Sequence, residues 1–452
     1  MGTTSQPPHQ VTLLHPSIKD YEWGKRGQSS VVAQLAAKYL DKQTIDESKP
    51  YAELWMGTHP SGHSTCPEHS HKTLHDHLDQ QELPYLFKVL SIQKALSIQA
   101  HPDKKLAERL HKQQPDNYKD DNHKPEMAIA VTPFSGMCGF RGADKIIHYL
   151  QTVQELQSII GQSTVEKFNQ LKGTDTKAAI KHLFSALMNV NTTTLEQYLP
   201  PLIQRLQQQY PNYQQQYHSE ATQQHGSENS NPNTSSVQMN GNSSTVAATK
   251  NGIEKEHIDV VDLNPDLIVL TLYDDFKADV GVLCPYILNC VSLQPGGALF
   301  LGPNIPHAYL SGDIIECMAQ SDNVVRAGLT PKYRDVENLI EMLTYESGHV
   351  TQLHPTKNDS HSKLYAPSKD FPEFACTAIT LSSNDGQYKL PSTSSHCILL
   401  TYNGNGELQS TEKTLDLTSG TVAFIPADTT VTVTAAGNKP LILYRCSANN
   451  SK

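Results

Sequence analysis

Short apolar runs alternate with turns through the first third of the chain. The clearest runs, Tyr85–Leu90 and Met127–Val131, are bounded by stretches rich in Gly, Pro and His. Apolar runs of this length between turn signals are typical of buried strands. We therefore predict that residues 1–145 fold mainly as β-structure.

From Lys145 onward the apolar spacing becomes helical. Apolar residues recur three and four positions apart, as on one face of an amphipathic helix. Two series show this spacing: Ile146, Ile147, Leu150 and Val153, then Ala178, Ile180, Leu183, Phe184 and Leu187. A third helix is expected over residues 195–206. The pattern predicts a helical domain over residues 146–280, inserted into the β-structure.

The strand-like pattern returns after residue 280. Ile287–Leu293 and Ala298–Leu301 flank a turn at Pro295–Gly297, and together they read as a hairpin. We expect residues 281–350 to complete the β domain that begins with residues 1–145.

Residues 351–452 repeat this style of sequence. The segment Val422–Ala427 echoes Leu299–Asn304, which predicts a second β-barrel related to the first. No histidine in the second copy takes the position of His307, so we expect it to hold no metal.

One segment differs in composition from the rest of the chain. Residues 207–252 are rich in Gln, Asn, Ser, Thr and Gly and nearly free of large aliphatic residues. Such a segment buries too little apolar surface to offset the entropy lost on ordering. We predict a mobile insertion within the helical domain, with a partner-binding arm as the alternative.

Composition and charge exclude several classes of function. The 452 residues carry a formal net charge of −10, which argues against a nucleic-acid or anionic membrane surface. A small anionic substrate therefore needs a local basic pocket. No apolar stretch approaches the ~20 residues of a membrane helix, and the first residues lack the pattern of a signal peptide. The eight cysteines include no Cys-x-x-Cys pair, so we expect reduced core thiols and a cytoplasmic location.

Candidate metal ligands lie in three separate segments. In Leu96–Lys104, which reads as a strand, Ser97, Gln99 and His101 alternate with apolar residues and share a face. Glu126 and His307 lie in two further segments that mix polar residues with proline. Together Gln99, His101, Glu126 and His307 offer the nitrogen and oxygen donors that a zinc-like metal accepts.

A second group of histidines competes as a metal site. It comprises His63, Cys66, His69, His71, His75 and His77. His71 and His75 are four residues apart, a spacing that zinc ligands on a helix sometimes use. The run lacks apolar periodicity, and we interpret it as an exposed loop or short helix.

Long stretches of the chain resemble the type I phosphomannose isomerases. The resemblance includes Tyr51–Gly62, Leu310–Ala319 and Ser321–Gly328, together with the segments that carry the candidate ligands. It implies two cupin-type (jelly-roll) β domains with a helical domain inserted into the first, so a mainly β fold. It also implies one Zn²⁺ per chain, held by Gln99, His101, Glu126 and His307.

The resemblance further implies a reaction. Members of this family interconvert mannose 6-phosphate and fructose 6-phosphate, a step that supplies GDP-mannose synthesis. Such an aldose–ketose isomerase opens the sugar ring and moves a proton between C1 and C2 through a cis-enediol. Arg326 matches an arginine essential in the family, and we expect it to stabilise the anionic intermediate.

The proton-transfer base stays open among three residues. Glu316 lies in an apolar strand, where a carboxylate is costly unless it is paired, so it is either a functional group or half of a structural ion pair. Lys124 and His123 lie beside Glu126 in sequence, and we expect Lys124 to share a strand face with Glu126. We favour Glu316 for the C1–C2 transfer and His123 or Lys124 for ring opening.

Phosphate recognition requires donors near the same strands. Ser97 and Lys88 are candidates, and Lys332 lies six residues beyond Arg326. For the two lysines, a solvated surface position is the alternative. Tyr309 shares a face with His307 and is expected to line the pocket.

Two other functions use the same fold. A metal-dependent oxygenase would use two histidines and a carboxylate with iron, but Gln99 as a fourth ligand argues against it. A non-catalytic sugar-phosphate sensor is the second alternative, and retention of Glu316, Arg326 and Lys124 argues against it. We expect a monomer with a phosphosugar substrate and no nucleic-acid or membrane partner.

Overall fold

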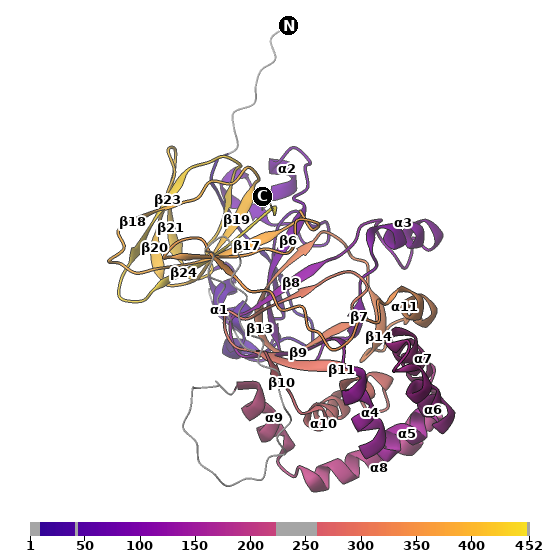
Figure 1. Ribbon diagram of the computed structural model, residues 1–452. Coiled ribbons are helices and arrows are strands. Elements are labelled where there is room, and N and C mark those ends of the chain that lie inside the picture. Colours follow the sequence, from indigo (N-terminus) through magenta and orange to yellow (C-terminus); the bar gives the residue numbers. More distant parts are fainter. Residues whose placement is uncertain (1–9, 41–43, 223–259, 450–452) are drawn as a thin grey trace.

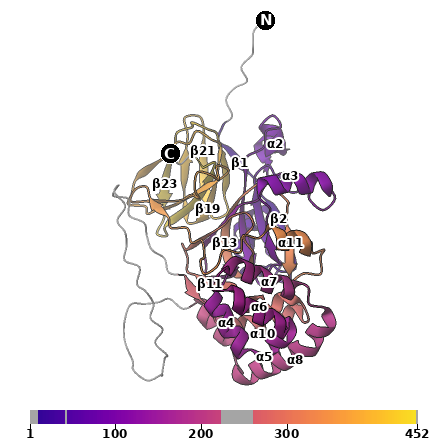
Figure 2. The same cartoon turned by 45° about the vertical axis from the view of Figure 1, so that its right-hand side comes forward.

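The computed structural model describes residues 10–40, 44–222 and 260–449. Two groups of sheets lie side by side, and a cluster of helices packs against one end of the larger group (Figures 1 and 2). The larger group carries the candidate ligands. The helices come from the middle of the chain, and the smaller group comes mainly from its C-terminal quarter.

The long strand β13 (His307–Ala319) runs through both sheets of the larger group. Its first half pairs with β9 and β7, and its second half pairs with β6 and β8. The register shifts between Tyr309 and Ser311, and Gly312 has a φ of +110°. Here β13 passes from one sheet to the other. Its partners are β6 (Tyr85–Ile92), β7 (Ile98–Ala100), β8 (Glu126–Ala130) and β9 (Phe134–Phe140).

Two layers follow from these pairings. One sheet has the order β12-β8-β13-β6-β3-β2, and the other has the order β10-β11-β9-β13-β7-β14. The outer strands are β2 (Ser17–Lys19), β3 (Glu53–Met56), β10 (Val261–Asp262), β11 (Leu288–Leu293), β12 (Ala298–Leu301) and β14 (Val325–Gly328).

The predicted apolar strands are confirmed, although only Ile98–Ala100 of Leu96–Lys104 is a strand, and the predicted hairpin is wrong. β11 pairs with β9 and β10, whereas β12 pairs with β8. The turn at Pro295–Gly297 therefore crosses between the layers. The amide nitrogen of Gly296 donates to the carbonyl of Ala130, which anchors the crossing to β8. The two apolar strands are adjacent in sequence and are separated by a Pro-Gly turn, a pattern typical of a hairpin. Each strand instead pairs with strands elsewhere in the chain.

Seven helices between β9 and β11 form the helical cluster of the described residues. They pack on the sheet that holds β7, β9 and β11, in one core with Ile98, Met137 and Leu288. Side-chain caps fix several starts: Asp175 accepts from the amide of Ala178, and Asn191 accepts from that of Thr194. The helices are α4 (Ala143–Thr152), α5 (Gln154–Ile160), α6 (Gln162–Leu171), α7 (Thr176–Met188), α8 (Thr192–Gln209), α9 (Tyr213–Thr222) and α10 (Pro265–Phe276).

The three predicted helices are confirmed as α4, α7 and α8. The prediction of a mobile insertion is wrong for residues 213–222, because they form α9. The hydroxyl of Tyr217 lies 2.5 Å from Ser135 Oγ, and Ala221 is buried. Aromatic residues at helical spacing within the Gln-rich sequence anchor this helix. The remainder of the predicted insertion, residues 223–252, lies outside the described residues.

Smaller elements complete the part of the chain before residue 350. They are α1 (Val31–Ala36), α2 (Leu74–His77), α3 (Lys104–Gln113), α11 (Val336–Met342), β4 (Thr65–Cys66) and β5 (Lys72–Thr73). Asp103 caps α3 by accepting from the amide of Leu106. This cap places the helix directly after the ligand-bearing strand β7.

The C-terminal part has two further sheets, of seven and four strands. β1 (Thr12–Leu14) pairs with β22, so the first described strand belongs to the C-terminal sheet and not to the first β domain. The strands are β15 (Thr356–Lys357), β16 (Ser362–Tyr365), β17 (Ala375–Leu381), β18 (Gln387–Leu390), β19 (Cys397–Asn403), β20 (Asn405–Gln409), β21 (Thr414–Thr418), β22 (Val422–Ile425), β23 (Val431–Ala436) and β24 (Leu441–Ser447).

The fold class agrees with the prediction of β domains with a helical insertion. The sheets do not close into barrels over the described ranges. The exact domain limits stay a prediction. All eight cysteines are buried, which confirms the expectation that they are core residues, and they are not joined in disulfides. Every helix in the described part of the chain is too short or too polar to cross a lipid bilayer.

Gly312 gives a test of the bend in β13. A Cβ at this position would lie 2.5 Å from the carbonyl oxygen of Pro133 and 2.7 Å from Cα of Phe134. We expect Gly312→Ala to lower the free energy of unfolding by about 3 kcal/mol, since backbone strain and overpacking add. Chemical denaturation measures the change.

Gly437 is the matched control. It has a φ of +82°, and nothing lies within 4 Å of the place that a Cβ would take. Gly437→Ala should therefore cost only the backbone strain, about 1 kcal/mol. Equal losses in the two variants would contradict a steric constraint at Gly312.

Candidate metal centre and active site

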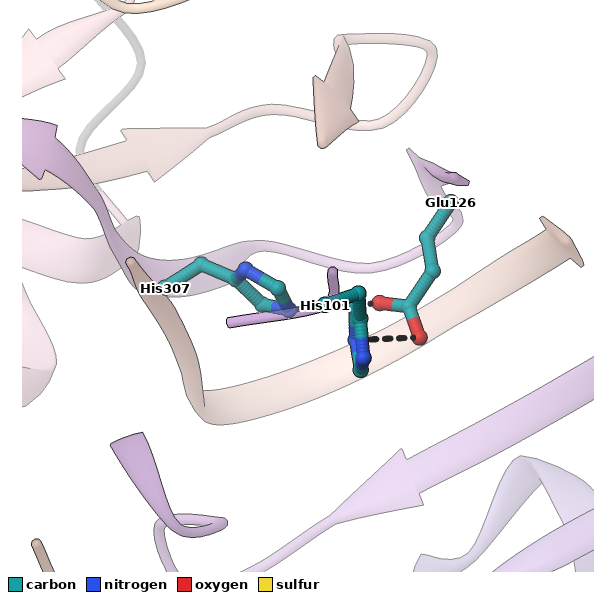
Figure 3. Close-up of side chains that lie close together, drawn as sticks. All are labelled: His101, Glu126 and His307. Carbon is teal, nitrogen blue, oxygen red and sulfur yellow. Dashed lines mark ion pairs between the residues drawn. The ribbon is translucent and has the colours of Figure 1, made fainter. Parts of the chain in front are cut away.

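Three buried side chains converge between the strands of the larger β group. His101, Glu126 and His307 each offer one donor atom, and these three atoms all lie within 4.8 Å of one another (Figure 3). His101 Nε2 lies 3.1 Å from Glu126 Oε1, and His307 Nε2 lies 3.4 Å from Glu126 Oε2. Among the described residues this is the one His, Cys, Asp or Glu cluster with such spacing.

Backbone carbonyls orient both imidazole rings. Nδ1 of His101 lies 2.7 Å from the carbonyl oxygen of Asn323, and Nδ1 of His307 lies 2.9 Å from that of Ile305. A neutral ring that donates from Nδ1 keeps a lone pair on Nε2. Both Nε2 atoms are buried and make no hydrogen bond, despite their short distances to Glu126. Two aligned, unsatisfied ring nitrogens beside a carboxylate fit the donor set of a zinc ion.

The charge states of these groups also suit a metal. Burial lowers the pKa of His101 to about 4, so the ring is neutral near pH 7. Burial alone would raise the pKa of Glu126, but His101 and Lys124 hold it well below its usual range. Lys124 Nζ lies 3.5 Å from Glu126 Oε1. A neutral imidazole and an ionised carboxylate are the forms that bind metal.

The strand register places Gln99 next to this cluster. Gln99 on β7 lies opposite His307 on β13 and opposite Arg326 on β14. Directly opposed residues in a sheet share a face, so the side chains of Gln99, His307 and Arg326 lie on the same side. Ile98 and Ala100 point into the core, as the alternation predicted.

A short turn holds two of the ligand segments together. Asn304 has a φ of +63°, and its amide nitrogen donates to the carbonyl of His101. Its side-chain amide donates to Asp103 Oδ2 at 2.9 Å. Asn tolerates this left-handed conformation better than most residues. The turn before His307 is thus fixed to the segment that carries His101.

A row of charged side chains extends from the cluster across β13, β6 and β3. Glu316 on β13 lies opposite Lys88 on β6, and Lys88 Nζ lies 3.0 Å from Glu316 Oε2 and 3.7 Å from Glu53 Oε2. The hydroxyl of Tyr309 donates to Glu316 at 2.9 Å and lies 3.3 Å from Glu126. Tyr309 therefore links the candidate base to the metal ligands.

Burial shapes the ionisation of this row. It raises the pKa of Glu316, and the nearby Lys88 only partly offsets that effect. Burial alone would lower the pKa of Lys88, but Glu316 and Glu53 raise it above its ordinary value. Lys88 is 6% exposed, so the alternative of a solvated surface lysine is wrong for this residue.

A cavity of about 590 Å³ opens beside Arg326. Ser97, Arg326 and Lys332 line it, whereas Lys88 and Tyr309 do not. Two further cations on its wall are paired, Arg26 with Glu22 and Lys94 with Asp275. Within the described ranges, the charged ends of Arg326 and Lys332 have no such partner. The volume lies within the usual range for small-ligand sites.

The two remaining catalytic candidates, Lys124 and His123, contact different partners. Strand β8 begins at Glu126, so Lys124 precedes it and does not share a strand face with it as expected. Its ammonium group still reaches Glu126. His123 Nε2 lies 2.6 Å from Oε1 of Glu373, a residue of the C-terminal part.

The histidine run forms pairs of rings. The ring centroids of His63 and His75 are 5.3 Å apart, and those of His69 and His77 are 4.6 Å apart. Cys66 lies on β4, His75 and His77 lie on α2, and the other three histidines lie in the segments before and after β4.

Two residues of this region had no role in the sequence analysis. Glu53 is buried in the apolar strand Glu53–Met56, which is the same signal that pointed to Glu316. Glu373 carried no such signal, because it lies in a loop about 250 residues from His123 in sequence. Only the folded chain brings that pair together.

The fold and the site together define a metal-dependent enzyme of the cupin class. Comparison with known proteins narrows this class. Residues 11–143 match the model of the phosphomannose isomerase type I catalytic domain. Mannose-6-phosphate isomerase of Homo sapiens is 37% identical over 461 residues, which cover 96% of this chain and 98% of the relative. The Cryptococcus neoformans enzyme of the same name is 37% identical over 460 residues, covering 92% and 94%.

Solved structures agree. Mannose 6-phosphate isomerase from Salmonella typhimurium, bound to substrate (f6p) and zinc, superposes with a TM-score of 0.73 at 27% identity. The superposition covers 97% of this chain and all of the other. The chain belongs to the type I mannose-6-phosphate isomerase family.

Removal of one ligand tests the metal centre. Zinc at about 100 times its dissociation constant should stabilise the wild-type chain by about 2.7 kcal/mol. We expect His307→Ala to abolish this response, because it removes one of two aligned ring nitrogens. Thermal unfolding with and without zinc, together with the zinc content per chain, measures the effect.

His63→Ala is the control, since it removes a ring from the competing histidine run. It should keep both the zinc response and one zinc per chain. If His63→Ala instead lost the response while His307→Ala kept it, the assignment of the metal to His101, Glu126 and His307 would be wrong.

Proposed function

We propose that this chain interconverts mannose 6-phosphate and fructose 6-phosphate through a cis-enediol, feeding GDP-mannose synthesis. Zinc would be held by four residues: Gln99, His101, Glu126 and His307. One observation carries the proposal. A buried His-Glu-His cluster with two unsatisfied ring nitrogens lies next to the buried carboxylate of Glu316 and the guanidinium of Arg326, which has no ion pair among the described residues. Full-length similarity to mannose-6-phosphate isomerases supports the choice of substrate.

The cavity beside Arg326 suits a phosphosugar. Lys332 supplies a point charge and Ser97 a hydroxyl donor for the phosphate. Arg326 has no carboxylate partner in the described part of the chain, and burial lowers its pKa. A half-buried cation without a counter-ion is stabilised when an anion enters. We assign Arg326 to the substrate oxygens that become negative in the enediol.

The C1–C2 proton transfer falls to Glu316. When bound, zinc would act as a Lewis acid that polarises a sugar oxygen. A raised pKa brings the carboxyl of Glu316 closer to neutral pH, where a base can both take and return a proton. Tyr309 and Lys88 each contact one oxygen of this carboxylate and fix its orientation. We assign Lys88 to this role in place of the phosphate-donor role predicted from sequence, because Lys88 is paired with Glu316 and does not line the cavity.

Ring opening needs a second proton-transfer group near the sugar ring. His123 and Lys124 are the two candidates, and both lie directly before the ligand Glu126. Lys124 contacts Glu126, while one ring nitrogen of His123 makes no hydrogen bond to the described residues. We propose further that the protein is monomeric and cytoplasmic, with a phosphosugar and no nucleic acid or membrane as its partner.

A coupled assay tests the reaction and the metal together. Purified protein should convert mannose 6-phosphate to fructose 6-phosphate. Chelation should abolish the activity and added zinc should restore it. A folded, zinc-loaded protein that binds mannose 6-phosphate without converting it would instead be a sensor. Iron- and O₂-dependent turnover would identify an oxygenase.

Substitution of Glu316 distinguishes a catalytic role from a purely structural role. We expect Glu316→Gln to lower kcat by roughly 100-fold or more, since it removes the group that carries the proton. Exchange of the C2 proton with deuterated solvent should fall in parallel, and mass spectrometry measures it.

Asp313→Asn is a matched control on the same strand. Asp313 is buried and pairs with Lys25 at 2.5 Å, away from the metal cluster. This variant should keep C2 exchange even if it unfolds more easily. Near-normal turnover and exchange in Glu316→Gln would show that another residue is the base.

A further inference from the structure

The segment before Glu126 is fixed from one side by the loop after β13. Asn122 donates from its side-chain amide to the carbonyl of Gln320 at 2.9 Å. Asn323 donates back to the carbonyls of Asp120 and Asn122, at 2.8 and 2.9 Å. The carbonyl of Asn323 is the group that orients His101. The loop after β13 thus connects Asp120–Asn122 to the candidate ligand His101 through Asn323.

The other side of the segment is held by the C-terminal part. Glu373, just before β17, accepts a hydrogen bond from His123 Nε2 at 2.6 Å. Phe371 stacks on the same ring, with centroids 6.2 Å apart and an interplanar angle of 25°. Both groups come from one loop of the C-terminal part. Two contacts of different kinds therefore fix the plane and the rotation of the His123 ring.

The ionisation of Glu373 determines which atom donates the hydrogen bond between His123 and Glu373. Burial alone would raise the pKa of Glu373, but the hydrogen bond from His123 lowers it below its ordinary value. An ionised carboxylate accepts only, so Nε2 of His123 carries the proton. In the neutral ring Nδ1 is then the acceptor. Nδ1 has no partner among the described residues and is not a buried atom. It is the nitrogen available to a sugar hydroxyl.

This arrangement parallels that of functional histidines in general. A carboxylate on one ring nitrogen selects the tautomer and leaves the other nitrogen to act on the substrate. The second oxygen of Glu373 is buried and makes no hydrogen bond in the described part. The carboxylate is thus committed to His123 and does not serve a wider structural network.

We propose that Glu373 is a positioning residue of the isomerase site, contributed by the C-terminal part of the chain, and that it acts through His123. This inference rests on the proposed function, in which His123 takes part in ring opening. It gives a loop of the C-terminal part an indirect role in catalysis. Loss of Glu373 should lower the rate of the chemical step while substrate and zinc still bind.

A double-mutant cycle tests this proposal. Glu373→Gln keeps the size of the side chain and removes its charge. We expect kcat to fall by roughly tenfold to 100-fold, the range seen when a partner that orients a functional histidine is lost. KM and the zinc content should change little. In a His123→Ala background, Glu373→Gln should have no further effect on kcat, because both variants remove the same function.

Controls separate positioning from general stability. Tyr365→Phe removes another hydrogen bond between the two β parts, from Tyr365 to the carbonyl of Gly296 at 2.9 Å. It should leave kcat unchanged. Glu373→Asp, which retains the charge, should recover part of the activity. Circular dichroism and thermal unfolding verify that each variant is folded before its rate is compared.

The outcomes are distinct. An additive loss in the His123→Ala background would make Glu373 a structural residue and overturn the inference. So would full activity of Glu373→Gln alongside an impaired His123→Ala. Full activity of His123→Ala would remove the assigned role of His123. No conversion of mannose 6-phosphate by the wild-type chain would refute the proposed function itself.

Discussion

The metal centre depends on the balance of charge in a buried space. Three carboxylates, Glu53, Glu126 and Glu316, lie with side chains no more than 9% exposed, and two lysines, Lys88 and Lys124, lie among them. With neutral imidazoles, three negative charges against two positive ones leave an excess of one negative charge. Buried charge without compensation is costly. A divalent cation at His101, Glu126 and His307 would reverse that excess and leave a site that attracts an anionic sugar.

The same balance explains the state of Glu316. Without the cation, the raised pKa of Glu316 lets the site relieve part of its excess charge by binding a proton. The cation at Glu126 would oppose that protonation, because it adds positive charge near the row. Metal binding and the ionisation of the proposed base are therefore linked through Tyr309, whose hydroxyl contacts both carboxylates. Bound metal would thus favour the ionised form of Glu316, which is the form that a base needs.

The sequence predicted the elements better than their pairing. Strands such as Tyr85–Ile92 and helices such as Thr176–Met188 have strong local periodicity, so they were found from spacing alone. Gln99 and His101 were found because polar side chains interrupt an apolar strand, whereas Glu126 and His307 were identified mainly through the resemblance to the type I family. The pairing of the two strands around Pro295–Gly297 and the placement of Thr12–Leu14 were not predicted, because each of these strands pairs with a partner far away in sequence. Glu373 was missed for the same reason.

A single irregularity in β13 brings the site together. Side chains alternate along a strand, so His307 and Glu316, nine residues apart, would face opposite sides of a regular strand. The register shift after Tyr309 and the positive φ at Gly312 break this alternation. His307 and Tyr309, which precede the bend, then face the same space as Glu316, which follows it. There the hydroxyl of Tyr309 donates to Glu316. The bend lets one strand belong to two sheets and carry both a metal ligand and the proposed base.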